Sequence, residues 1–334
     1  MLRFVVRRLL LLLPILVGLS ILVFLWIRAL PGSPATTLLG ERTTPEAVAA
    51  IEEQYGLNKP IHEQYWAYAR NWLQLDFGNS ITTRQPVVEE FSQRFPATIE
   101  LAVAAMLFSV LFGIPLGFLA AKKYGSWIDQ ASLAASLLGI SIPIFVLAIL
   151  LKWLFAVKLG LLPTVGRISV LINIDHPTNF YVLDALIAGD MEALWDTIKH
   201  LILPAVALGS IPLAIIARIT RASVLDVQNE DYVRTARAKG VSSGIVDRRH
   251  ILRNALLPIA TIIGLQTGLL LSGAVLTETV FAYPGIGTWL VQAIEDRNYP
   301  VLQAGILFVA IVFVLVNLVV DVSYAYLNPR IRLS

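Results

Sequence analysis

The sequence has no cysteine, only four histidines and few charged residues. The absence of cysteine excludes disulfides, cysteine-ligated zinc, iron–sulfur clusters and thiol catalysis. Four scattered histidines do not make a histidine-rich metal site, so no metal site is expected. Only 15% of the 334 residues are charged and 57% are hydrophobic, against about 25% and roughly 45–50% in ordinary soluble domains. Together with the mean hydropathy of +0.72, this composition excludes a typical soluble protein.

Charge is absent altogether from the cores of six long apolar stretches. A helix needs roughly 20 apolar residues to cross about 30 Å of hydrocarbon. The six stretches are Leu9 to Leu30, Ile99 to Ala121, Ala131 to Val157, Leu201 to Thr220, Ile259 to Phe281, and Val301 to Tyr326. The pattern predicts an all-α integral membrane protein with six transmembrane helices. A cleaved signal peptide is the alternative for the first stretch, but its apolar run is too long and no A-x-A site follows.

The basic residues are distributed unevenly around these stretches. With both termini placed in the cytoplasm, 15 of the 26 Lys and Arg residues lie inside, but only 6 of the 23 acidic residues do. An excess of Lys and Arg in cytoplasmic segments sets the orientation of membrane proteins. We therefore expect a multi-pass protein of the cell membrane with cytoplasmic termini. The net charge of +3 is then a signal of topology, and no nucleic-acid partner is expected.

The predicted spans divide the chain into three parts. Residues 1–30 hold the N-terminal segment and first span, residues 31–98 form an extracytoplasmic cap, and residues 99–334 form a core with five spans. In the cap, helices are expected near Thr44 to Glu46 and from Pro60 to Leu73. The aromatic residues of the second helix either pack at the membrane surface or contact a substrate. A further outer loop, 158–200, contains a predicted interfacial helix from Val182 to Lys199.

The longest cytoplasmic segment, residues 222–258, has the most ordered pattern of helix signals. Asn229 is a good N-cap, acidic residues follow it, and Gly240 can end the helix in the left-handed conformation. This predicts a short helix from about Glu230 to Lys239, then a second from Ser242 or Ser243 toward Pro258. The segment is either a basic loop that follows the orientation rule or a docking surface. Exposed Tyr232 and Val233 on a capped helix favour docking.

This segment resembles the coupling loop of ABC importer permeases, in particular the first permease subunit of the dipeptide, oligopeptide and nickel group. The matching stretches in the loop are Asp231 to Gly240 and Arg253 to Pro258. Relative to the general pattern E-A-A-x3-G-x9-I-x-L-P, the chain has Arg234-Thr235-Ala236 and a spacing of 14 residues, two features of the peptide branch. Further similar stretches, in the order of the family, are Arg7-Arg8, Leu30 to Gly32, Phe95 to Thr98, Lys158 to Pro163, Glu278 to Phe281, Tyr283 to Gly287, and Asn328 to Arg330.

The resemblance implies a division of labour between this chain and its partners. The sequence has no G-x-x-x-x-G-K-[ST] phosphate loop, so ATP with Mg is expected on two separate ATP-binding subunits, and the chain itself is expected to be neither an enzyme nor a cofactor protein. The other implied partners are a second homologous permease and an extracytoplasmic substrate-binding protein. The implied ATPase-coupling residues are Tyr232, Val233, Arg234, Thr235, Ala236, Arg237, Ala238, Lys239 and Gly240.

Polar residues of the fifth stretch are candidates for the translocation path. Gln266, Thr267 and Ser272 lie among glycines, and Glu278 follows near the outer end. The alternative is that small residues pack helices together and hydroxyls bond locally. An ion-coupled carrier needs ionisable residues within the spans, and an intramembrane enzyme needs a catalytic constellation there. The charge-free cores disfavour both.

The cargo is not fixed by these residues. The resemblance is strongest to the peptide branch, which makes dipeptides or oligopeptides the expected cargo. Nickel, glutathione or another small solute are the alternatives, because the binding protein of such importers sets much of the selectivity. The sequence also leaves open whether the two ATPases are separate chains or one fused chain.

Overall fold

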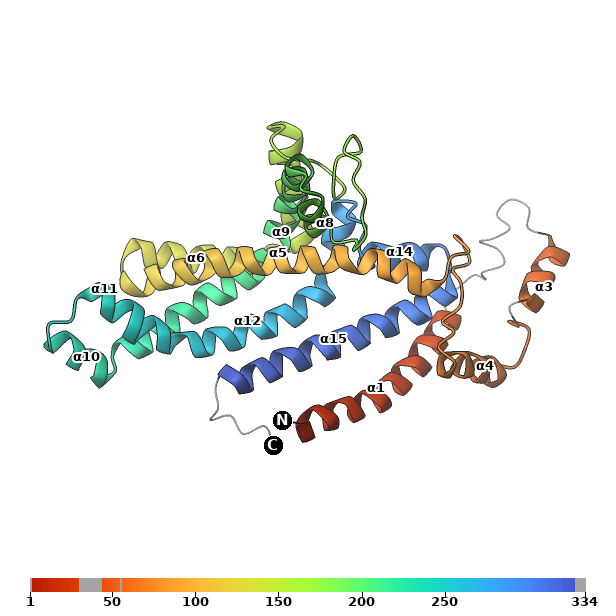
Figure 1. Cartoon of the computed structure of the whole chain (residues 1–334), viewed down its shortest axis with the longest axis horizontal. Coiled ribbons are helices and arrows are strands. Elements are labelled where there is room, and N and C mark those ends of the chain that lie inside the picture. Colours follow the sequence, from red (N-terminus) through yellow and green to blue (C-terminus); the bar gives the residue numbers. More distant parts are fainter. Residues whose placement is uncertain (1, 30–43, 55, 328–334) are drawn as a thin grey trace. The chain divides into compact units, whose positions relative to one another are not determined.

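The computed structural model describes residues 2–29, 44–54 and 56–327 (Figure 1), and these are helical apart from loops and one isolated bridge between Asn79 and Pro86. The described residues form two compact units, one of 97–283 with 316–327, the other of those within 2–96 with 284–315. The helices are α1 (Leu2–Ala29), α3 (Pro45–Gln54), α4 (Ile61–Leu73), α5 (Val87–Lys122), α6 (Trp127–Ser141), α7 (Ile144–Leu151), η2 (Lys152–Lys158), α8 (Tyr181–Ala188), α9 (Met191–Gln228), α10 (Asp231–Ala238), α11 (Ser243–Ile245), η3 (Val246–Leu252), α12 (Arg253–Gly273), α13 (Val275–Val280), α14 (Ile286–Glu295) and α15 (Tyr299–Leu327).

Four of the described helices are long and apolar enough to cross a bilayer, namely Leu10–Ala29 of α1, α5, α9 and Tyr299–Val319 of α15. The third predicted span is instead a bent pair, in which α6 and the α7–η2 helix meet at 103°. Pro143 explains the break, because proline lacks an N–H group and forces the residue before it into an extended conformation. The fifth predicted span is divided between α12 and α13. The six-span count and the orientation of the termini stay predictions.

The helix predictions outside the spans have mixed outcomes. The two helices expected in the cap are present as α3 and α4. The helix expected from Val182 to Lys199 is interrupted, because Gly189 takes a left-handed conformation at the end of α8 and the Asp190 side chain caps the start of α9. The prediction of Asn229 as an N-cap is wrong. It ends α9, and Glu230 is the N-cap of α10.

The close packing of α5 against α9 depends on glycine. Ser109 of α5 donates a hydrogen bond of 2.8 Å from its Oγ to the carbonyl oxygen of Gly209 in α9. A Cβ atom at Gly209 would lie 2.6 Å from the carbonyl oxygen of Ala105, and one at Gly117 would overlap the carbonyl oxygen of Ala217. Neither position has room for a side chain. The two backbones therefore approach directly, as small residues allow helices to do in membranes.

Two apolar cores run along the helices of this first unit. One gathers around Phe281 and Tyr283, which are 2% and 0% exposed, with residues of α5, α7 and α9. The other gathers around the fully buried Ile216, Ile251 and Ile259 and includes residues of α10. The short helix α10 is thus part of the folded core and is not a loosely attached loop.

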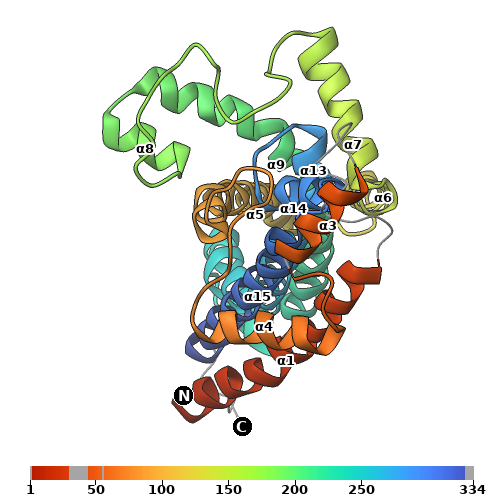
Figure 2. The ribbon, with the colours of Figure 1, turned by 90° about the vertical axis from the view of Figure 1, so that its right-hand side faces the viewer.

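The second unit joins α1, α4, α14 and the beginning of α15. Val23, Ile27 and Trp289 lie in its core, and α4 runs beside α1 (Figure 2). The hydroxyls of Ser20 and Tyr65 lie 3.0 Å apart where these two helices meet. Tyr68 and Trp72 continue the line of ring contacts, whereas Trp66 on the same helix is 73% exposed. Most of the predicted aromatic face is therefore used for packing within the unit.

The α5–α9 contact provides a test of the packing. We expect Gly117→Leu to destabilise the protein by about 1–3 kcal/mol, the usual cost of overpacking a close contact, because the side chain would meet the α9 backbone. Thermal unfolding in detergent measures the effect. Gly244→Leu is the matched control, since no atom lies within 4 Å of a Cβ at Gly244. Equal unfolding temperatures for the two variants would contradict this account.

Candidate functional site

The candidate site is the coupling loop, in which α10 and α11 lie together at one end of α9 and α12 (Figure 1). One face of α10 is anchored in the core, with Val233 and Ala236 0% and 8% exposed. The expectation that Val233 projects toward a partner is therefore wrong. An eight-residue helix is not stable by itself, and burial of these two side chains stabilises it on the end of the unit.

Gly240 ends α10 with a complete pair of capping hydrogen bonds. Its φ of 74° is left-handed, as expected from the sequence. The amide of Gly240 donates to the carbonyl of Arg237 at 3.0 Å, and the amide of Val241 donates to that of Ala236 at 3.2 Å. This is the Schellman arrangement. It turns the chain sharply toward α11 and fixes the direction in which α10 points.

The opposite face of α10 is open and mostly polar. Tyr232 is 42% exposed, and its hydroxyl accepts a hydrogen bond of 3.1 Å from the Asn254 side chain. Asp231 and Arg234 form an exposed ion pair. The predicted coupling residues on this exposed side are Tyr232, Arg234, Thr235, Arg237, Ala238, Lys239 and Gly240. They offer a partner hydrogen bonds and positive charge, and little apolar surface.

Two ion pairs connect the ends of the neighbouring helices near this loop. Lys122, the last residue of α5, lies 2.9 Å from a carboxylate oxygen of Asp247 in η3. Arg221 of α9 holds Asp129 of α6 through two hydrogen bonds of 2.5 and 2.9 Å, and the amide of Gly125 donates to the same carboxylate. Such bidentate pairs fix geometry as well as charge. The loop is thus connected to α5, and α9 to α6.

The proposed path residues lie on α12 and α13. Gln266 of α12 is 9% exposed, and the hydroxyl of Thr267 donates to the carbonyl of Ile263 within its own helix. The Ser272 side chain lies outside the described residues. Gly268, between them, packs against the side chain of Asn317 in α15. Local bonding therefore accounts for Thr267 in this conformation.

Glu278 is fully buried, and its carboxylate accepts a hydrogen bond of 2.7 Å from the Thr98 hydroxyl. This contact joins α13 to α5 and brings together two of the sequence stretches that carried the resemblance. A role of Glu278 at the outer gate stays a prediction.

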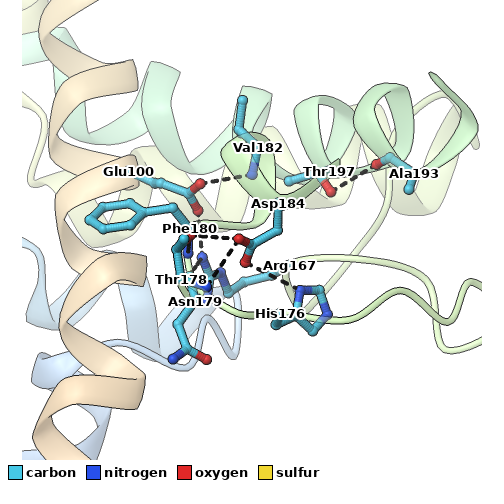
Figure 3. A network of polar contacts seen from close by, with 10 residues as sticks. All are labelled: Glu100, Arg167, His176, Thr178, Asn179, Phe180, Val182, Asp184, Ala193 and Thr197. Atoms are coloured by element: carbon cyan, nitrogen blue, oxygen red, sulfur yellow. Dashed lines mark hydrogen bonds and ion pairs between the residues drawn. The ribbon is translucent and has the colours of Figure 1, made fainter. Parts of the chain in front are cut away.

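A polar network links α5 to the loop between η2 and α8, and to α8 itself (Figure 3). Glu100 of α5 receives a hydrogen bond of 2.5 Å from Arg167 and one of 2.8 Å from the amide of Val182. The guanidinium of Arg167 also donates to the carbonyl of Asn179 and lies 3.7 Å from the ring centre of Tyr181. Both charged side chains are nearly buried, at 3% and 8% exposure. The network holds this loop against α5.

Asp184 and His176 form the second half of this network. One oxygen of the buried Asp184 carboxylate accepts from the amide and hydroxyl of Thr178, and the other lies 3.7 Å from Nδ1 of His176. The His176 ring stacks on Tyr181 at 3.6 Å. Burial lowers the pKa of His176, an effect that Asp184 opposes and Arg167 reinforces. Among the described residues, no group of three His, Asp or Glu side chains is arranged to hold a metal.

Two family models match almost the entire chain. Residues 1–102 match the N-terminal model of the membrane component of binding-protein-dependent transport systems, and residues 113–333 match the inner membrane component itself. The chain belongs to this family. It is a multi-pass protein of the bacterial cell membrane, as its sequence predicts.

Full-length relatives of the permease are known. It is 49% identical to the dipeptide transport system permease protein DppB of Alkalihalophilus pseudofirmus, over 99% of this chain and all of that one. It is 50% identical to the di/tripeptide permease DppB of Pseudomonas aeruginosa and 43% identical to the glutathione permease GsiC of Escherichia coli, each over 99% of both chains. The fold is similar to that of the inward-facing MetNI methionine ABC transporter, with a TM-score of 0.51 over 70% of this chain and 93% of that chain, at 18% identity.

Several residues that organise the permease were not singled out from its sequence. Glu100 and Arg167 are far apart in sequence, and no local pattern pairs them. Asp129 and Arg221 form a bidentate pair, and no local sequence pattern indicates that they meet. Asp129 is an isolated acidic residue in the first turn of an apolar helix. Because a charge in such a place requires a partner, this position could have indicated an ion pair.

Asp129 and Arg221 provide a test of stability. Asp129→Asn removes the negative charge from a nearly buried pair, and we expect a loss of about 2 kcal/mol, as for a charged group deprived of its partner. Asp231→Asn is the control, because its ion pair with Arg234 is exposed and exposed pairs contribute about 0–1 kcal/mol. Thermal unfolding of both variants in detergent tests this. A larger loss for Asp231→Asn would contradict it.

His176 predicts a pH dependence. Because the folded pKa lies below the ordinary value of 6.5, the unfolded chain takes up the proton first as the pH falls. We therefore expect the free energy of unfolding to be unaffected by His176 above pH 6.5. Below that pH it should decrease, because the unfolded chain binds the proton more readily than the folded one. His176→Gln should flatten the fall in unfolding temperature between pH 7 and 5. His62→Gln, at an exposed histidine of α4, is the control. An unchanged pH profile in His176→Gln would refute the assignment.

Proposed function

We propose that this permease is the membrane-spanning subunit of an ATP-driven importer of dipeptides or short oligopeptides. The observation that carries the proposal is the full-length identity of 49% and 50% to dipeptide and di/tripeptide permeases. In the proposed assembly, a second homologous permease completes the translocation path. Two ATP-binding subunits supply the energy, and an extracytoplasmic binding protein delivers the peptide.

The exposed face of α10 is the proposed docking surface for an ATP-binding subunit. Two contacts support this role, namely the burial of Val233 and Ala236 on one side and the capping at Gly240 on the other. Together they make α10 a rigid projection, so a force on its outer face is transmitted to α9 and α12 with little internal bending. Arg237 and Lys239 give this face a positive charge. A partner groove with acidic and hydrogen-bond-accepting groups would complement it.

ATP-driven closure of the partner subunits would move α10 together with the helices attached to it. The Lys122–Asp247 pair connects the loop to α5, and the Arg221–Asp129 pair connects α9 to α6. These helices would then tilt as a group between inward-open and outward-open arrangements, a domain motion of the two-state kind. In this mechanism both termini are cytoplasmic.

Glutathione is the second candidate cargo, because a glutathione permease is 43% identical over the same length. Glutathione is a γ-linked tripeptide, so both candidates have amide groups, an ammonium group and a terminal carboxylate, and glutathione carries one further carboxylate. For either cargo, Gln266, Thr267, Ser272 and Glu278 are proposed to approach the path only when the second permease is present.

Uptake by cells that carry the complete transporter tests the cargo. Cells lacking other peptide importers should accumulate a labelled dipeptide only when this permease, its partner permease and both ATP-binding activities are present. Competition by unlabelled dipeptide but not by glutathione supports the first cargo, and the reverse supports the second. Co-purification in mild detergent should recover the ATP-binding subunits. A permease that purifies alone and moves peptide in response to a proton gradient would overturn the proposal.

Reversal of charge on the docking face should uncouple the transporter. We expect Arg237→Glu to reduce uptake at least tenfold, and ATP hydrolysis should no longer respond to the loaded binding protein, because the exposed guanidinium is proposed to meet the partner. Lys123→Glu, at another exposed cation of the segment between α5 and α6, should retain uptake within about twofold. Equal loss in both variants would show a general charge effect in place of docking.

Gly240→Pro should abolish uptake while leaving membrane insertion intact. Proline cannot adopt the φ of 74° and cannot donate the amide hydrogen bond to Arg237. Gly244→Ala is the control, since its site is open and its φ is not positive. Ala236→Arg should also abolish uptake, but it places a charge in the core and so tests the packing of α10 more than its docking. Normal uptake by Gly240→Pro would refute the role of α10.

A further inference from the structure

A cavity of about 470 Å³ lies within the second unit, separate from the coupling loop and the path residues. It is enclosed by the end of α1, the end of α3, one side of α4, the segment 76–81 and the first two turns of α15. Its volume falls within the range of about 300–1,000 Å³ that small-molecule sites occupy. Aromatic side chains form much of the wall, with Trp72, Phe77 and Tyr299 among them.

Three side chains with hydrogen-bond donors, Arg28, Tyr68 and Gln303, are among those that line the cavity. Gln303 of α15 is 8% exposed, and within the described structure its amide nitrogen has no hydrogen-bond partner. The same holds for the hydroxyl of Tyr68 on α4. Arg28 donates to the Gln64 side chain at 2.8 Å and to the Phe24 carbonyl at 3.3 Å, which uses two of its five N–H groups. Buried donors require acceptors, and the three together suit an oxyanion.

The exposed charged residues of the cavity lining are mostly negative. Glu53, Glu63 and Asp76 line the cavity and are exposed, as is the cation Lys59. These carboxylates would repel a simple anion, but they would attract an ammonium group carried by the same molecule as the oxyanion. The arrangement of charge therefore fits a zwitterion better than phosphate or another plain anion.

We propose that this cavity binds a zwitterion, with its oxyanion on Arg28, Tyr68 and Gln303 and its ammonium group near the exposed carboxylates. Two sources have this chemistry. One is the headgroup of an ethanolamine phospholipid, because the cavity lies where α1 and α15 reach the ends of their apolar stretches and its aromatic side chains are of the kind that favours the membrane–water interface. The other is a free peptide, a source that rests on the proposed function.

Titration calorimetry on the detergent-purified transporter without its binding protein tests the proposal. The probes are alanyl-alanine, dihexanoyl phosphatidylethanolamine below its micelle concentration, and inorganic phosphate. We expect one of the two zwitterions to bind the wild type, and Arg28→Gln to weaken that binding about tenfold or more, as loss of a charge-assisted hydrogen bond does. Arg70→Gln is the matched control, an exposed arginine on α4 outside the cavity.

The three probes also distinguish a lipid from a peptide ligand, and they define the results that would contradict the proposal. Selective binding of the lipid or of the dipeptide identifies the source. Gln303→Leu and Glu63→Gln should each weaken the same probe, and they keep the test available if Arg28→Gln does not fold. Binding of neither zwitterion, equal binding by wild type and both Gln303→Leu and Glu63→Gln, or equally tight binding of phosphate would overturn the proposal. Peptide uptake by the wild type is measured separately, so failure of the cavity does not count against the transport function.

Discussion

The direct backbone contact of α5 and α9 is the constraint on which the rest of the first unit depends. Helices in a bilayer gain little from hydrophobic association with one another, so close packing must supply the stability. Gly117 and Gly209 allow that packing, and Ser109 adds a hydrogen bond across it. Because α9 runs from α8 to the coupling loop, the segments at both ends of the unit are attached to the same closely packed pair of helices.

Both ends of this pair carry contacts of charged side chains, whereas the hydrogen bond in its middle joins the Ser109 hydroxyl to the Gly209 carbonyl. At one end, α5 supplies Thr98 and Glu100, which hold α13 and the loop before α8, respectively. At the other end, Lys122 of α5 and Arg221 of α9 reach the coupling loop and α6. Charged groups are tolerated at these depths because each has a partner of opposite sign or a hydrogen bond. A movement of α5 and α9 as a pair would therefore displace the segments attached at both ends at the same time.

The sequence was informative where a local rule applies. Gly240 as a left-handed helix end and Pro60 before α4 follow from backbone sterics, and long apolar runs follow from the thickness of the bilayer. It was less informative where a tertiary contact decides. Val233 looked available to a partner because nothing local indicates that α10 packs on its own core. The break at Pro143 was missed because a continuous apolar run conceals the loss of one amide hydrogen bond.

Because Val233 is buried, a partner that docks on α10 would contact mainly polar side chains. An apolar face directed at a partner would make association depend on hydrophobic contact and would expose that face whenever the partner was absent. Here the core of the permease covers it, and the outer face of α10 presents Tyr232 and charged side chains. Polar contacts contribute more to orientation than to affinity. A helix of this kind suits a joint that must remain in register while both sides move.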